Sequence, residues 1–141
     1  MKIVFLDRET ISPRTPVRRP AFDHEWEEYP RTGPAEAAAR LRDADVAIVN
    51  KVRLTADVLA QAPRLRLIAV AATGTDNIDL AACQARGIVV SNIRGYATHT
   101  VPEHTFALIF ALRRSSCAYR DAVRAGRWQQ AGQFCFFDHP I

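Results

Sequence analysis

The chain has 141 residues, of which 48% are hydrophobic and 24% charged, and its formal net charge is +4. This length suits one ordinary domain, which can bury about two-thirds of its unfolded surface without disulfides or metal. The composition excludes a disordered chain, and no uncharged stretch approaches the ~20 apolar residues of a membrane span. The start of the chain is acidic too early for a secretory signal, and the three cysteines form no close pair, so we expect a reduced, cytoplasmic protein.

The basic balance of the chain, with a pI near 9.3, raises the question of nucleic-acid binding. The arginines are scattered, and the acidic residues 23–28 follow the first of them, whereas nucleic-acid surfaces are more often one continuous basic face. Residues 98–104 hold two histidines and a glutamate, but not at the spacing of a zinc-binding helix. We therefore expect neither nucleic acid nor metal to bind.

Apolar runs and helical patterns alternate along the first part of the chain. Residues 2–6 predict a strand buried on both faces, and the proline-rich residues 10–31 predict an extended loop. A helix is expected over residues 35–42, with Pro34 at its first position, before a second buried strand over residues 45–49. Thr55 is expected to cap a short helix over residues 56–60.

The same alternation continues in the second part. Residues 65–72 predict a third strand, followed by a turn at Gly74 and a helix that starts at Asp76 or Asn77 and ends at Gly87. Residues 88–90 predict a fourth strand and residues 91–98 a polar loop. Residues 101–125 predict one long or broken helix, with Pro102 near its start, whereas residues 127–141, including the aromatic run 134–137, show no clear periodicity.

Strands that alternate with helices at this spacing predict an α/β fold with a parallel sheet. Right-handed crossovers would place helices on both faces of a flavodoxin-like, doubly wound sheet of about four or five strands. Ligands of such sheets bind beyond the carboxyl ends of the strands, which directs attention to residues 50–52 and 73–75. Gly74 would permit close approach of a ligand or a positive φ, although a plain turn glycine is routine between a strand and a helix and explains it more simply.

Several chemical signatures are missing from the chain. No serine or cysteine lies in a nucleophile motif, and there is no phosphate-binding P-loop. No two of the six glycines are separated by a single residue, so the GxGxxG fingerprint of dinucleotide-binding domains is absent.

Motifs in the second half of the chain carry a family resemblance. Residues 70–92 read VAATGTDNIDLAACQARGIVVSN, and residues 101–108 read VPEHTFAL. In this order and separation they resemble the D-isomer-specific 2-hydroxyacid dehydrogenases, most closely the glycerate dehydrogenase (hydroxypyruvate reductase) branch. The resemblance covers nearly the whole chain and is weakest over residues 10–31.

The resemblance implies a two-domain enzyme that reduces a small 2-keto acid to a D-2-hydroxy acid with NADH or NADPH. Residues 1–98 would form the flavodoxin-like substrate-binding domain, and residues 99–141 a crossover helix and the lead-in to a Rossmann domain. The substrate carboxylate would bind backbone amides of Thr73 and Gly74, with Lys51 and Val52 lining the cleft. Thr100 would lie beside the nicotinamide end of the cofactor.

The family's catalytic Arg, Glu and His would come later than this chain extends, and none of its four histidines stands in the catalytic position. We therefore expect an N-terminal portion that carries no catalytic residue, is inactive alone and binds no cofactor. Self-association or a homodimer through residues 101–112 is expected, because that helix is apolar nearly all round.

One alternative is a freestanding flavodoxin-like module that binds a small ligand or regulates a partner without catalysis. A receiver domain of this kind needs an acidic cluster after the first strand and an Asp at the end of the third. The chain offers only Asp7 and Glu9 after the first strand, and no Asp where the third one ends.

Overall fold

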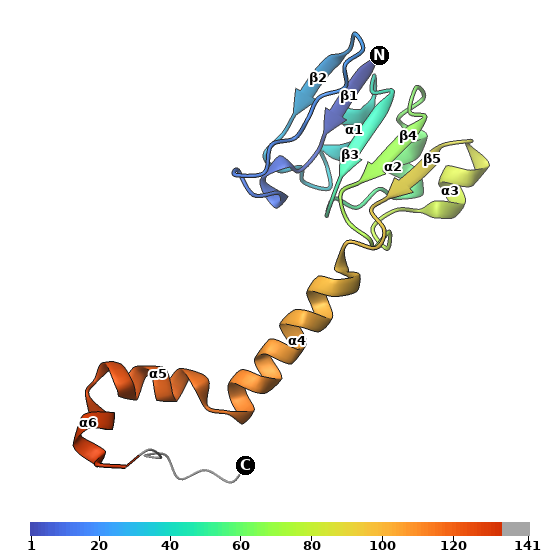
Figure 1. Ribbon diagram of the computed structural model, residues 1–141. Coiled ribbons are helices and arrows are strands. Elements are labelled where there is room, and N and C mark those ends of the chain that lie inside the picture. Colours follow the sequence, from blue (N-terminus) through green and yellow to red (C-terminus); the bar gives the residue numbers. More distant parts are fainter. Residues whose placement is uncertain (134–141) are drawn as a thin grey trace. The chain divides into compact units, whose positions relative to one another are not determined.

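The computed structural model describes residues 1–133, and the chain divides into two compact units, Met1–Arg94 and Gly95–Ile141. The first unit is built on a five-stranded sheet in which every pairing is parallel and the order is β2-β1-β3-β4-β5 (Figure 1). The strands are β1 (Lys2–Phe5), β2 (Glu25–Glu28), β3 (Val46–Val49), β4 (Leu67–Val70) and β5 (Val89–Asn92). This is the flavodoxin-like order, so the predicted fold class is confirmed.

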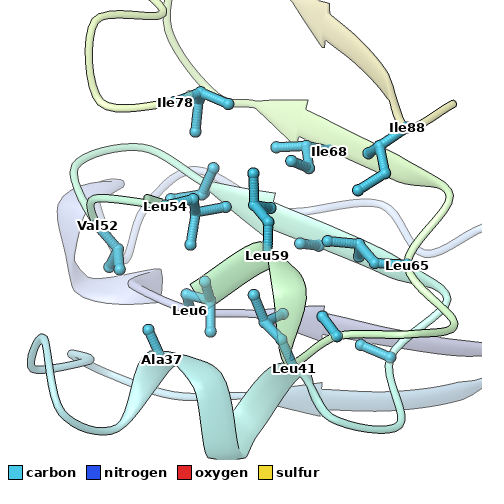
Figure 2. Close-up of a cluster of buried hydrophobic side chains, with 14 of the residues drawn as sticks. Leu6, Ala37, Leu41, Val52, Leu54, Leu59, Leu65, Ile68, Ile78 and Ile88 are labelled. Atoms are coloured by element: carbon cyan, nitrogen blue, oxygen red, sulfur yellow. The ribbon is translucent and has the colours of Figure 1, made fainter. Parts of the chain in front are cut away.

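All three α-helices of the first unit cover the same face of the sheet. They are α1 (Ala37–Leu41), α2 (Ala56–Ala60) and α3 (Leu80–Ala85). Leu41, Leu59 and Cys83 from these helices belong to one buried cluster with the strand row Val4, Ala47 and Ile68. Figure 2 shows Leu41, Leu59 and Ile68 in this cluster. The prediction of helices on both faces is wrong for this unit. The β1–β2 connection would supply the helix of the other face, but there the structure has only the 3-10 turn η1 (Arg8–Thr10), in keeping with its prolines.

The other face of the sheet carries an apolar hollow of about 760 Å³. Strand residues Ile3, Ile48 and Leu67 line it together with Phe22 from the β1–β2 connection. Asp45, Arg64 and Arg66, which also line it, precede β3 and β4, so the hollow extends to the amino ends of these strands.

Strand β2 corrects the prediction of a continuous loop over residues 10–31. Its backbone pairs in parallel with β1, and the ammonium of Lys2 lies 3.6 Å from Glu25 and 2.9 Å from Glu27. The acidic sequence of β2 is a poor strand former, so neighbouring β1 and its lysine decide the structure.

The predicted cap of α2 is confirmed, since the hydroxyl of Thr55 accepts the N–H of Val58 at 3.4 Å. The other two helices start later than expected. Helix α1 begins at Ala37, and Pro34 lies in the preceding turn. Helix α3 begins at Leu80 with Asp79 as its cap, because Asn77 and Ile78 pair with residues 50–54 instead of joining the helix.

The second unit consists of helices α4 (Ala97–Arg113), α5 (Ser116–Arg124) and α6 (Arg127–Ala131). The polar loop predicted over residues 91–98 is shorter in the structure, because β5 extends to Asn92 and α4 begins at Ala97. Pro102 and Glu103 therefore lie beyond the first turn of α4. The long helix is broken at Ser115, whose φ is +49°. Helix α6 was not expected, and residues 134–137 lie outside the described residues.

Within residues 1–133, no helix has the length and hydrophobicity needed to cross a membrane.

Asp45 predicts a pH dependence of the stability of the first unit. The N–H of Lys2 (2.7 Å) lowers the pKa of Asp45 most, and the guanidinium of Arg64 (2.9 Å) adds to this, against the opposing effect of burial. A lowered pKa stabilises the fold above the carboxyl's unfolded pKa, and this stability is lost as the pH falls through the folded pKa. We expect Asp45→Asn to cost about 1.5–3 kcal/mol at pH 7, the range for hydrogen bonds to charged groups. Urea unfolding from pH 7 to pH 2 should show the two proteins converging in acid; a constant gap would contradict the assignment.

Candidate functional site

The carboxyl ends of the parallel strands bring three segments to one edge of the sheet. Asp7 follows β1, residues 50–52 follow β3, and residues 71–75 follow β4. In this strand order the topological switch point lies between β1 and β3, where flavodoxin-like folds bind their ligands.

The turn after β4 presents Thr73 and Gly74 to solvent. Asn92 in β5 holds this turn by donating its side-chain amide to the carbonyl of Thr73 at 2.7 Å. Within residues 1–133, the structure gives neither the N–H of Thr73 nor that of Gly74 an acceptor. Two backbone donors at the carboxyl edge are thus available to an anion.

Neither backbone strain nor crowding around a Cβ requires a glycine at position 74. Its φ is outside the left-handed region, and a Cβ added to it would meet the Asp76 carboxylate at 3.5 Å, an ordinary contact. Of the two conformational reasons expected for this glycine, the positive φ is therefore excluded. The two explanations that remain for Gly74 are the close approach of a ligand and an ordinary turn glycine.

Asn77 joins the turn after β4 to the loop after β3. Its side-chain amide donates to the carbonyls of Val52 (2.9 Å) and Asn50 (3.4 Å), and its own carbonyl accepts the N–H of Leu54 at 2.8 Å. A bridge between Leu54 and Ile78 completes the connection. The two loops that hold the predicted site residues are therefore fixed to each other.

Lys51 and Val52 line a pocket of about 400 Å³, together with Asp7, Glu9, Thr10, Arg31 and Thr32. Glu9 and Arg31 pair with each other at 2.8 Å, whereas no carboxylate among residues 1–133 forms an ion pair with the exposed Lys51. Lys51 therefore places a positive charge without an ion-pair partner at this pocket, which Asp7 also lines with its carboxylate. Thr73 and Gly74 do not line this pocket, so the structure connects the two pairs of predicted residues through Asn77 rather than in one cavity.

Thr100 lies in the second unit, in the first turn of α4, where its hydroxyl donates to the carbonyl of Tyr96 at 3.3 Å. Its predicted place beside a nicotinamide stays a prediction, as do the roles of Lys51, Val52, Thr73 and Gly74. The assignment of residues 1–98 and 99–141 to different domains of an enzyme also stays a prediction.

Sequence reasoning missed Asp7 and Asn77 as parts of the site. Asp7 is only 3% exposed, and its carboxylate accepts backbone N–H groups from the loop after β3. A signal for it was present, because a carboxylate directly after a buried first strand falls at the switch point of a doubly wound sheet.

The edge of the sheet can bind and orient a small carboxylate with N–H groups and a lysine. The chain contains no GxGxxG turn, the feature that receives a pyrophosphate in dinucleotide-binding domains. By its fold and this edge, the chain is a flavodoxin-like domain suited to a small anionic ligand.

Comparison with known proteins identifies the family. Residues 6–131 match the D-isomer specific 2-hydroxyacid dehydrogenase family, catalytic domain, and the chain belongs to this family. It is 53% identical to a glycerate dehydrogenase of Methylorubrum extorquens over 99% of its length, and 29% identical to a hydroxypyruvate reductase of Blautia hydrogenotrophica over all of it. The chain spans 44% and 45% of the lengths of these two relatives.

Solved structures agree with this assignment. An acyclic imino acid reductase in complex with NADPH and D-Arg superposes with a TM-score of 0.69 at 28% identity, over 89% of this chain and 41% of the other. An NAD-dependent formate dehydrogenase of Staphylococcus aureus in complex with NAD gives 0.65 at 27% identity, over 89% and 41%. Membership of this family leaves no support for the alternative of a freestanding regulatory module.

Proposed function

We propose that this chain provides the substrate-binding part of a reductase that converts a small 2-keto acid, in the first place hydroxypyruvate, to a D-2-hydroxy acid. The observation that carries the proposal is the pair of unpaired N–H groups at Thr73 and Gly74, on a turn that Asn77 fixes to the Lys51 loop. Family membership and the similarity to a glycerate dehydrogenase support the reaction class.

In this proposal the substrate carboxylate accepts the N–H groups of Thr73 and Gly74. Lys51 and Val52 line the approach, and the charge of Lys51 attracts the anion. Binding the carboxylate orients the keto group, so the chain contributes positioning. The catalytic acid and the cofactor, NADH or NADPH, would be held by other parts of the enzyme, apart from Thr100, which we place beside the nicotinamide.

We further propose that the enzyme acts in a reducing, cytoplasmic compartment and assembles as a homodimer through residues 101–112. The described cysteines, Cys83 and Cys117, are both free thiols, which supports the compartment. The exposed apolar side chains of α4 support the assembly.

The proposal predicts that activity requires more than these residues. We expect the 141-residue chain alone to show no NADH- or NADPH-dependent reduction of hydroxypyruvate, because it holds neither a dinucleotide turn nor the catalytic acid. A chimera, in which the chain replaces the aligned segment of the Methylorubrum extorquens glycerate dehydrogenase, should reduce it. Absorbance at 340 nm measures both. Turnover by the chain alone would contradict the prediction, and a folded but inactive chimera would contradict the proposed function.

A further inference from the structure

The carboxylate of Asp7 is bound by three successive backbone N–H groups. That of Asn50 donates to Oδ1 at 3.0 Å, and those of Lys51 and Val52 donate to Oδ2 at 2.6 and 3.2 Å. Asp7 is 3% exposed, so this is an almost fully buried charge satisfied by the main chain.

Successive N–H groups that converge on one point form a site for an anion. At this switch point the chain fills that site with its own carboxylate. Hydrogen bonds to a charged acceptor are stronger than neutral ones, so Asp7 fixes the loop without a ligand. The N–H groups of residues 50–52 are consequently occupied, whereas the turn after β4 keeps free backbone donors, those of Thr73 and Gly74 among them.

The same loop is held from its other side by Asn77. The carbonyl of Val52 accepts from Asn77 at 2.9 Å while its N–H donates to Asp7. A path of direct contacts therefore runs from Asp7 through residues 50–52 to Asn77, three residues after Gly74 in the chain. Loss of the carboxylate would release the loop that carries Lys51 and would expose a competing anion site.

We propose that Asp7 is a positioning residue: its carboxylate acts as a built-in anion that holds residues 50–52 in place and directs the substrate carboxylate to Thr73 and Gly74. This inference rests on the proposed function for its effect on substrate. The effect on the loop is independent of any activity.

The experiment removes the internal anion and supplies an external one. Asp7 lines the 400 Å³ pocket, so Asp7→Ala opens a site that formate can reach. In the 141-residue chain, NMR-detected exchange of the amides of residues 50–52 should accelerate about tenfold or more and slow again with millimolar formate. In the chimera, Asp7→Ala should raise the KM for hydroxypyruvate about tenfold with kcat within about twofold, and formate should lower that KM. In the unsubstituted chimera formate should raise KM by competition.

Asp45→Ala is the matched control. It removes another buried carboxylate that accepts a backbone N–H, but at the amino end of β3, and should lower stability without changing KM. Asp7→Asn, which keeps the shape and loses the charge, replaces Asp7→Ala if that variant does not fold, and is then judged by KM and amide exchange without formate. An unchanged KM in an active chimera, or amides of residues 50–52 that formate does not protect, would overturn the proposal. If the chimera without any substitution is inactive, that result counts against the proposed function. The amide exchange of residues 50–52 then decides the role of Asp7.

Discussion

Gly74→Val in the chimera should raise the KM for hydroxypyruvate about tenfold or more, equivalent to about 1.4 kcal/mol or more of lost binding. A β-branched side chain at this exposed turn would stand between the N–H groups of Thr73 and Gly74 and a ligand. Because an added Cβ meets only an ordinary contact and φ is not positive, Gly74→Ala should fold normally. The effect would therefore report on the ligand rather than on strain.

Gly87 provides a control in which a substitution should affect stability and not substrate binding. It follows α3 with a φ of +66°, and a Cβ there would meet nothing within 4 Å. Gly87→Ala should cost about 1 kcal/mol of stability because non-glycine residues disfavour the left-handed region, and it should leave KM unchanged. Steady-state kinetics and urea unfolding of both variants separate binding from folding. Unaltered kinetics in Gly74→Val would exclude this turn as the carboxylate site.

The central strands could be predicted because their own residues carry the signal. Runs such as residues 46–49 are entirely apolar and lie in the middle of the sheet, where Ala47 and Val49 are fully buried. Strand β2 lies at the edge and has no such run. Its structure depends on Lys2 and the backbone of β1, which are more than twenty residues away in the chain, so local patterning could not find it.

The candidate site also has one part that the sequence shows and another that only the folded chain shows. Gly74 is visible in the sequence because a glycine between a strand and a helix marks the carboxyl edge of a parallel sheet. The contacts of Asp7 span 43 to 45 residues, and those of Asn77 span 25 and 27. Asn77 was expected to begin a helix, whereas its side chain serves the loop after β3, and only the folded chain shows this.

Helix α4 exposes apolar side chains from which we expect the chain to self-associate. Its exposed apolar side chains include Phe106 (56%), Phe110 (60%) and Leu112 (80%), and the rings of Phe106 and Phe110 stack at 6.2 Å. At about 25 cal/mol per Å², keeping a few hundred Å² of apolar surface in water costs several kcal/mol. A surface of this kind marks an interface, and a second copy of the chain can cover it.

We therefore expect the 141-residue chain to sediment as a dimer or larger species at micromolar concentration. Phe106→Glu combined with Phe110→Lys should shift it to a monomer, because charges at these positions oppose burial of the helix. Met1→Gln, which replaces an exposed apolar residue of the first unit, is the control and should leave association unchanged. Sedimentation velocity measures the species, and a dye that fluoresces on apolar surfaces measures what each leaves uncovered. A monomeric parent chain that binds no dye would contradict the prediction, because it would mean that the apolar side chains of α4 are covered within a single chain.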